Sequence, residues 1–201
     1  MEAIEVTFHN AGLRSSIECN MCSRCPRDRV HGCCKISPVF LLTDIGFFLN
    51  NNSIGFLKSL LKSPYAEIGD NYLKVKAIKG VDGRRYCRFH HPEIGCRLPI
   101  LYRNTVCRQF LCPEVSLWRD SRAKRWAAFW LRLQEEEIIL NQALGRECQK
   151  NNCSLRFRQN ACLELIKTLY RELSRNTSPL FNSYPVTEVL LLTPRLPVKS
   201  K

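Results

Sequence analysis

The sequence predicts an α+β fold, with a small irregular cysteine-cluster domain that contains short helices and a hairpin, followed by an antiparallel helical pair. Three observations predict this class. Most of the twelve cysteines lie in the first half of the 201-residue chain, and the segment from Cys19 to Lys35 is rich in Arg, Pro and Gly and lacks apolar periodicity. A short alternating segment in the same half indicates a strand. Two long segments in the second half repeat apolar residues at helical spacing.

The first elements are expected to be a cysteine-rich loop and two short helices. The segment from Cys19 to Lys35 lacks apolar periodicity, which predicts a loop held together by something other than a core. Thr43 and Ser53 are typical N-cap residues, and each precedes apolar residues at helical spacing. We therefore expect two short helices that end before Pro64.

A strand and a hairpin are expected next. Apolar residues alternate with lysines over residues 73–78, which predicts a half-buried strand. The dipeptide Asp82-Gly83 is a strong turn signal. It predicts a hairpin into residues 85–89, with Cys87 on the second strand.

Two helices and a tail complete the predicted order. Residues 121–144 and 155–173 have helical apolar spacing, and a connection at 145–152 favours an antiparallel pair. A short strand is expected at 186–192. The predicted parts are a cysteine-rich metal-binding domain, a helical hairpin and a Pro-containing tail, at residues 1–118, 119–176 and 177–201.

Eight cysteines form a broken series that predicts a metal centre. The first thirty residues have no basic segment leading into an apolar run, so we expect a cytosolic protein. Cytosolic thiols stay reduced, and clustered cysteines there are more often metal ligands than disulfides. The predicted ligands are Cys22, Cys25, Cys33, Cys34, Cys87, Cys96, Cys107 and Cys112. Sulfur ligands suit both an iron–sulfur cluster and zinc, and the dispersed ligands and basic surroundings favour iron–sulfur.

Other cysteines and the histidines have less definite roles. Adjacent residues of an extended segment point to opposite sides, so Cys33 and Cys34 are not both expected at one ion. Cys162 lies on the apolar face of a predicted helix, which favours packing. Cys19, Cys148 and Cys153 are either bystanders or extra ligands. The histidines near the series favour supporting roles over direct zinc ligation: His31, His90 and His91.

The order and flanks of the series resemble the CxxCxxCC family, also called YkgJ-like, which is described as zinc- or iron-chelating. The matching pieces are Cys22-x2-Cys25, Gly32-Cys33-Cys34-Lys35, the apolar segment from Pro38 to Gly46, Cys87-Arg88-Phe89, Cys96, and Cys107-Arg108-Gln109-Phe110-Leu111-Cys112. Seven residues separate Cys25 from Cys33, where the family has two. Flagellin lysine N-methylases carry a similar cysteine arrangement and look like iron–sulfur proteins, so the resemblance implies that an enzyme is possible.

The net charge of the chain indicates which kinds of partner it could bind. Lys and Arg exceed Asp and Glu by 31 to 18, a formal charge of +13. Eleven basic residues fall within residues 84–132, and positive charge near cysteines favours the thiolates that metals require. Arg122, Lys124 and Arg125 lie at a helix start, where their charge opposes the helix dipole, so a nucleic-acid partner is also possible. No apolar run reaches the roughly 18 residues of a membrane span.

These observations predict a cytosolic, cysteine-ligated metal-binding protein with an iron–sulfur centre, as a redox or protein-modifying enzyme component. The alternative is a structural zinc module that presents a basic surface to RNA or another acidic partner. No Gly-rich nucleotide loop follows a predicted strand, so the sequence does not support a methyl-donor site. Whether the protein is an enzyme is not decided by these residues. The physiological partner, a protein or redox partner, is not identified by the residues.

Overall fold

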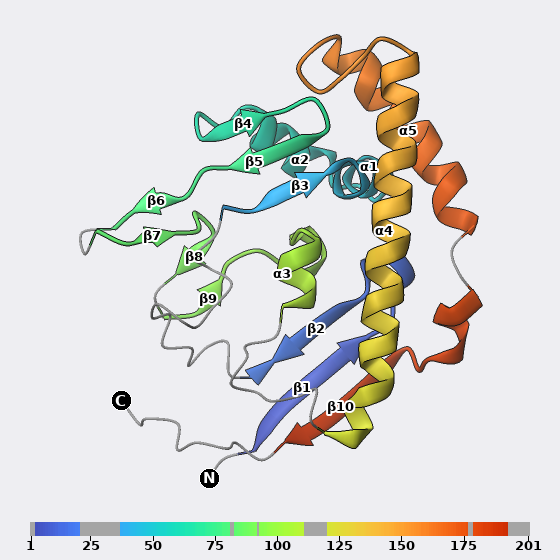
Figure 1. Cartoon of the computed structure of the whole chain (residues 1–201). Helices are drawn as coiled ribbons and strands as arrows, with labels where there is room; N and C mark the ends of the chain where they lie inside the picture. Colours follow the sequence, from blue (N-terminus) through green and yellow to red (C-terminus); the bar gives the residue numbers. More distant parts are fainter. Residues whose placement is uncertain are drawn as a thin grey trace. The chain divides into compact units, whose positions relative to one another are not determined.

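The structure is a computed structural model (Figure 1) that describes residues 3–20, 37–80, 83–91, 93–110, 120–176 and 179–192. Within these ranges the chain forms five α-helices and ten short strands. Every strand pairing is antiparallel, and the sheets have two or three strands. Helices and small antiparallel sheets occur together, so the predicted α+β class is confirmed.

The chain folds into two compact units whose segments alternate along the sequence. The first unit comprises residues 1–35, 89–133 and 179–201, and the second unit comprises residues 36–88 and 134–178. The predicted domain boundaries at 118/119 and 176/177 touch residues 111–119 and 177–178, which lie outside the described residues. The three-part division therefore stays a prediction.

Three antiparallel strands form the sheet of the first unit. They are β1 (Ile4–His9), β2 (Ser16–Cys19) and β10 (Thr187–Leu192), in the order β10-β1-β2. Successive side chains of a strand point to opposite faces, so Ile4, Val6 and Phe8 share one buried face. The strand expected at 186–192 is confirmed, and its partner β1 is an addition to the predicted elements.

The first part of α4 (Lys124–Lys150) packs aromatic side chains on this sheet. The rings of Phe8 and Trp126 stack with centroids 4.6 Å apart. Trp126, Phe129 and Trp130 are buried, which confirms the core role indicated by their helical spacing. A buried indole needs a hydrogen-bond acceptor, and Nε1 of Trp126 donates to the Glu188 carboxylate at 2.6 Å. These contacts hold α4 to β1 and β10.

Residues 89–109 add a small hairpin and a short helix to the first unit. The hairpin joins β8 (His90–His91) to β9 (Gly95–Cys96), and α3 (Thr105–Gln109) packs on β2. The buried guanidinium of Arg14 donates to the carbonyl oxygens of Leu101 and Arg103, at 2.6 and 3.0 Å. The segment before α3 is therefore tied to the N-terminal strands.

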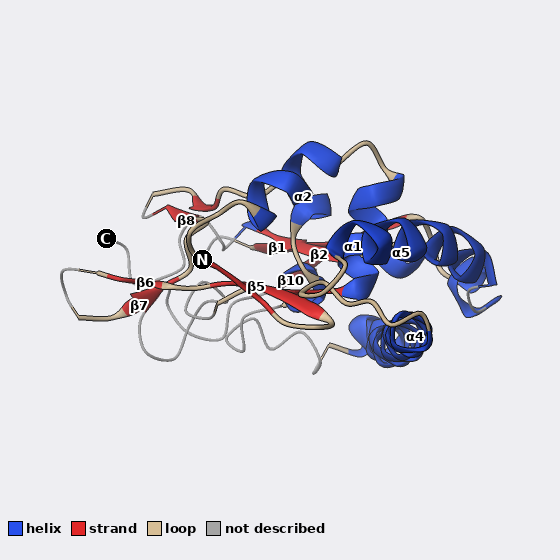
Figure 2. Cartoon of the chain, turned by 90° about the horizontal axis from the view of Figure 1, so that it is seen from above, coloured by secondary structure: helices blue, strands red, loops and turns tan. Residues whose placement is uncertain are grey.

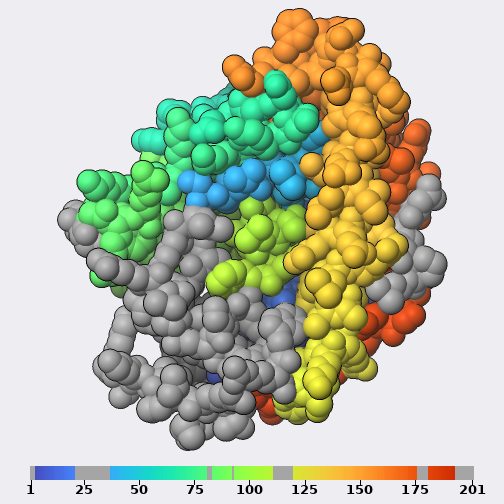
Figure 3. Space-filling view, viewed as in Figure 1, coloured from blue at the N-terminus to red at the C-terminus, as the bar shows by residue number. Residues whose placement is uncertain are grey.

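The sheet of the second unit contains β3 (Val39–Leu41), β4 (Ala66–Ile68) and β5 (Tyr72–Val75), in the order β3-β5-β4. In Figure 3 the light-blue residues of β3 lie next to the teal residues that include β5. Helices α1 (Leu42–Asn50) and α2 (Ile54–Leu61) follow β3. Phe40, Phe48 and Phe56 meet edge to face with centroids 5.2 to 6.2 Å apart. This cluster joins the sheet to both helices.

The two predicted short helices occur, but the first is capped differently. Helix α1 starts ahead of Thr43, the expected cap. The reason is Asp44, whose carboxylate accepts a hydrogen bond from the Leu41 amide at 3.2 Å and so satisfies the preceding turn. Ser53 does precede α2, although its hydroxyl donates to the Asn51 carbonyl rather than capping the helix.

The predicted strand at 73–78 is interrupted in the structure. It ends with β5 and resumes as β6 (Ile78–Lys79), which pairs with β7 (Arg85–Tyr86). The predicted hairpin is therefore present, with Gly83 at a φ of 75° in its turn. Cys87 directly follows β7 instead of lying on it.

The C-terminal helices also have different boundaries. Helix α4 continues through Gly145, where a connection was expected at 145–152. A Cβ atom at this glycine would lie 3.3 Å from the Asn71 amide nitrogen, so the glycine gives Asn71 room against the helix. Helix α5 (Gln159–Leu173) starts four residues after Leu155, the predicted first residue.

Helix α5 returns from the end of α4 and packs extensively on α1 (Figure 2). Gly46 of α1 allows this approach, since a Cβ there would lie 2.6 Å from ring carbons of Tyr170. The Asn50 side chain adds a hydrogen bond to the Lys167 carbonyl at 3.0 Å. The predicted helical pair is present, and α1 is the third helix of this group.

Candidate metal centre

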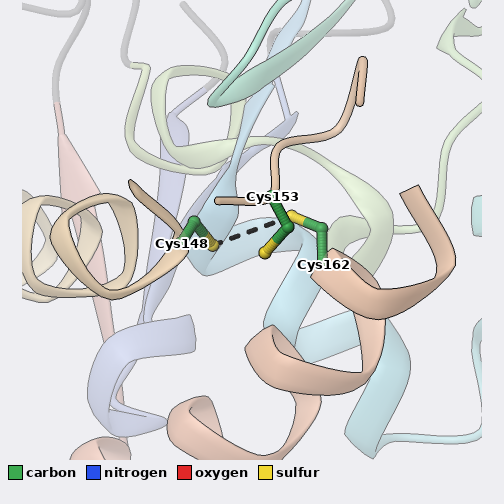
Figure 4. Close-up of side chains that lie close together, drawn as sticks. All are labelled: Cys148, Cys153 and Cys162. Atoms are coloured by element: carbon green, nitrogen blue, oxygen red, sulfur yellow. Dashed lines mark hydrogen bonds between the residues drawn. The ribbon is translucent and has the colours of Figure 1, made fainter. Parts of the chain in front are cut away.

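Three buried cysteines meet where α4 ends and α5 begins. Cys148 lies in the last turn of α4, Cys153 follows that helix, and Cys162 lies near the start of α5. Their exposed fractions are 1%, 7% and 0%. Figure 4 shows the three sulfur atoms pointing toward one another. All three Sγ atoms lie within 4.8 Å of one another, so this triad could hold a metal ion.

The end of α4 explains why Cys148 and Cys153 are neighbours. Asn152 adopts a left-handed conformation with φ of 49°. The Cys153 amide donates to the Cys148 carbonyl, and the Asn152 amide donates to the Gln149 carbonyl, both at 3.0 Å. These are the two hydrogen bonds of a Schellman motif, which brings together the side chains of its first and last residues. In this chain those side chains are thiols.

The loop after Cys153 brings the third thiol to this pair. Asp70 fixes the loop, because its carbonyl accepts from the Leu155 amide at 3.0 Å and its carboxylate accepts from the Ser154 hydroxyl at 2.9 Å. Arg158, with φ of 54°, then turns the chain into α5. The Sγ atoms of Cys162 and Cys148 are consequently 3.7 Å apart.

The pKa values of the three thiols are shifted in different directions. The hydrogen bond that Cys162 donates lowers the pKa of Cys148, against the opposing effect of burial. The same hydrogen bond, together with burial, raises the pKa of Cys162. Burial, followed by the charge on Cys148, raises the pKa of Cys153. Cys148 is therefore the first of the three to become a thiolate, and a bound cation would replace the remaining protons.

An open cleft of about 750 Å³ adjoins the triad, and Cys153 lines it. Most of its lining residues carry carboxamides or charges, including Asp70, Asn71, Arg146 and Gln149. Cys153 is thus the member of the triad with a route to solvent.

The structure describes three of the eight predicted ligands. Cys87 is buried in the second unit, whereas Cys96 and Cys107 are half-buried in the first unit. Within the described ranges, these three cysteines do not belong to a group of three or more close ligand atoms. The other predicted ligands lie outside the described residues: Cys22, Cys25, Cys33, Cys34 and Cys112. The eight-cysteine site stays a prediction.

Two residues near Cys107, Asn104 and Arg108, hold its segment in place. Asn104 caps α3, and its side-chain oxygen accepts from the Cys107 amide at 3.1 Å. Arg108 is fully buried and donates to the Ser15 carbonyl of the N-terminal segment at 2.6 Å. These hydrogen bonds therefore fix the position of Cys107 relative to β2, which ends at Cys19.

Two predicted supporting histidines lie in the β8–β9 hairpin. His90 is opposite Cys96 in the register, and His91 is opposite Gly95. Directly opposed residues of an antiparallel pair have Cβ atoms about 5 Å apart, so His90 is placed beside this predicted ligand. His31 lies outside the described residues.

The basic residues at the start of α4 have acidic partners within the first unit. Arg122 pairs with Asp120 at 2.7 Å, and Arg125 pairs with Glu188. The Arg122 hydrogen bonds lower the pKa of Asp120 to about 2. These pairs explain how positive charge is accommodated at a helix start.

The predicted series omitted the triad that the structure assembles. Cys162 is buried as expected, but its thiol faces two others instead of apolar packing alone. The available signal was the spacing Cys148-x4-Cys153-x8-Cys162 across a predicted helix, loop and helix. Four intervening residues at a helix end match the Schellman geometry, and this favours the extra-ligand alternative for Cys148 and Cys153.

Comparison with family models, curated proteins and solved structures finds no match for this chain. None of the helices in the described ranges combines the length and apolar character of a membrane span. The metal-binding potential of the triad therefore comes from its own geometry.

Proposed function

We propose that this chain is a cysteine-ligated metal-binding protein. The observation that carries the proposal is the buried triad, where Cys148, Cys153 and Cys162 bring three sulfur donors within 4.8 Å. Sulfur donors of this kind select zinc, copper(I) and iron over magnesium or calcium. The separate origin of the donors in a helix end, a loop and a second helix means that a bound ion would stabilise the surrounding fold.

We further propose that the cysteine series holds an iron–sulfur centre for redox or protein-modifying chemistry in the cytosol. The resemblance to the CxxCxxCC family supports this centre, as do the positive charges around the series. Arg108 supports it as well, because it fixes the Cys107 segment against β2, the strand that leads toward Cys22 and Cys25.

The zinc alternative is favoured at the triad by one observation, the 3.7 Å separation of two sulfurs, which fits a single ion. A basic surface for an acidic partner has less support. Arg122 and Arg125 engage Asp120 and Glu188 of the chain itself, which offsets part of the charge at that helix start.

Anaerobic purification with measurement of iron, sulfide and zinc tests the proposal. We expect bound metal, with iron accompanied by sulfide and by visible charge-transfer absorption. Cys107→Ser should lower the iron content, with Val106→Ala at a neighbouring exposed position as the matched control. Protein that is folded and free of transition metals would refute the proposed function.

A further inference from the structure

We propose that Cys148, Cys153 and Cys162 form a zinc site with three thiolate ligands and one exchangeable ligand from solution. This zinc site rests on the metal-binding function proposed above and is distinct from the iron–sulfur centre of the cysteine series. The sulfur spacing, the local charge and the adjoining cleft each favour it.

The sulfur positions fit a single ion. Zinc bonds thiolate sulfur at about 2.3 Å in a tetrahedral shell, so two ligating sulfurs lie about 3.8 Å apart. The Sγ atoms of Cys148 and Cys162 are 3.7 Å apart, and all three sulfurs lie within 4.8 Å. A four-iron cluster binds each cysteine to a different iron atom, which places the cysteine sulfurs farther apart than they are at a single ion. Side-chain rotation within the triad would bring the wider separations, of at most 4.8 Å, toward the spacing at a single zinc ion.

Charge favours a divalent ion over a monovalent ion. Three thiolates leave a net charge of minus one with zinc and minus two with copper(I), and a buried site penalises the larger charge. The N-terminal end of α5 adds a partial positive charge near Cys162, which compensates part of this negative charge.

The described parts of the chain supply three ligands and no fourth. No other described His, Cys, Asp or Glu places a ligand atom within 4.8 Å of all three sulfurs. Zinc prefers four ligands, and three-ligand protein sites hold water or substrate at the remaining position. Cys153 belongs to the triad and also lines the cleft. Ligands from solution would therefore reach the ion through the cleft, past this residue.

The lining of the cleft indicates which ligands it accepts. Carboxamides such as those of Asn71 and Gln149 donate and accept hydrogen bonds, and Arg146 adds a positive charge. Small polar molecules with a nitrogen or oxygen donor fit this lining.

X-ray absorption spectroscopy of the zinc-loaded full-length chain counts the ligands without any substitution. We expect three sulfurs and one nitrogen or oxygen in the zinc shell. A shell of four sulfurs would contradict the exchangeable position. Failure of the wild-type chain to retain zinc would contradict the site itself.

Cobalt(II) in place of zinc tests exchange, because its visible spectrum changes with its ligands. Added imidazole should shift the cobalt(II) spectrum to a saturable limit, as one ligand replaces water. A spectrum that does not change up to high imidazole concentrations would mean a closed shell and would overturn this inference.

Substitutions separate the two proposed centres. Cys153→Ser removes a ligand at the least buried triad position, so zinc should fall from about one ion per chain to near none while iron is retained. Cys107→Ser is the matched cysteine control and should lower iron while zinc is retained. Iron without zinc in the wild-type chain would overturn the zinc site alone. The absence of both metals would overturn the proposed function too.

Discussion

Gly46 and Gly55 are glycines of two consecutive helices with opposite surroundings. A Cβ at Gly46 would lie 2.6 Å from the Tyr170 ring, whereas a Cβ at Gly55 would have no atom within 4 Å. Close packing between α1 and α5 therefore depends on the missing side chain at position 46. Position 55 carries no such requirement.

Gly46→Ala should destabilise the chain by about 1–3 kcal/mol, because the ring of Tyr170 or one helix must move. The free energy of unfolding, measured in denaturant, checks this. Gly55→Ala is the matched control and should stabilise by up to about 1 kcal/mol, since alanine favours a helix. Equal effects of the two substitutions would contradict the close contact.

Glu188 makes stability depend on pH. Burial opposes ionisation of its carboxyl, yet hydrogen bonds from Arg125 and Trp126 lower its pKa below the ordinary value of 4.5. As pH falls through this range, the unfolded chain takes up a proton before the folded chain does. The stabilisation is therefore complete above about pH 5 and is lost as pH falls through the folded pKa.

Glu188→Gln should remove this pH dependence and cost about 1–3 kcal/mol at neutral pH, because the charged acceptor of two hydrogen bonds is lost. Unfolding free energies between neutral pH and about pH 3 provide the measurement. Glu172→Gln, at an exposed position of α5, is the control and should follow the wild type. Parallel curves for wild type and Glu188→Gln would contradict the assignment.

At the scale of elements, the end of α4 organises two of the three thiols. Asn152 takes the left-handed position that the motif requires, with φ of 49°.

Asn152→Gly should preserve both stability and zinc affinity, since glycine adopts this conformation freely. Asn152→Val should cost about 1–2 kcal/mol and weaken zinc binding, because a branched side chain is strained there. Denaturant unfolding and competition titration with a zinc chelator measure the two effects. Equal zinc affinity in both variants would mean that zinc binding does not depend on the Schellman motif.

Arg108 links α3 to the N-terminal segment. Arg108→Met should destabilise the chain by about 1–3 kcal/mol, because the buried Ser15 carbonyl loses a charged donor. Denaturant unfolding checks this value. Arg175→Met, at an exposed position after α5, is the control and should change stability by less than about 0.5 kcal/mol.

The elements that could be predicted from the sequence are those defined by local pattern. Helices α1, α2, α4 and α5 repeat apolar residues at helical spacing, and the β6–β7 hairpin has its Asp-Gly turn. Their ends depend on tertiary contacts, as with Asn71 beside Gly145. The pairing of β1 with β10 was not predictable in this way, because it joins Ile4 to Leu192 and leaves no local signal.

At the scale of the whole molecule, spacing indicated that cysteines are the site residues but not which of them meet. Cys148, Cys153 and Cys162 come together through backbone geometry at a helix end and through the anchor at Asp70. Neither contact follows from residue type alone. The predicted series lies largely outside the described residues and stays a prediction.

Zinc removal should destabilise the protein, because the triad joins three segments of the second unit. At a free zinc concentration one hundred times the dissociation constant, binding contributes about 2.7 kcal/mol. Thermal unfolding with zinc and with a chelator measures the shift. Cys153→Ser should show no zinc-dependent shift. A wild-type midpoint that is unchanged on chelation would contradict coupling between zinc and folding.

The β1–β10 pairing has a consequence for how the chain is made. Because β10 (Thr187–Leu192) is translated after β1 (Ile4–His9), one hydrogen-bonding edge of β1 has no partner until the residues between the two strands have been made. At ribosomal rates this delay amounts to roughly 10–40 s. During this interval the unpaired edge of β1 exposes backbone amide and carbonyl groups with which another nascent chain can pair.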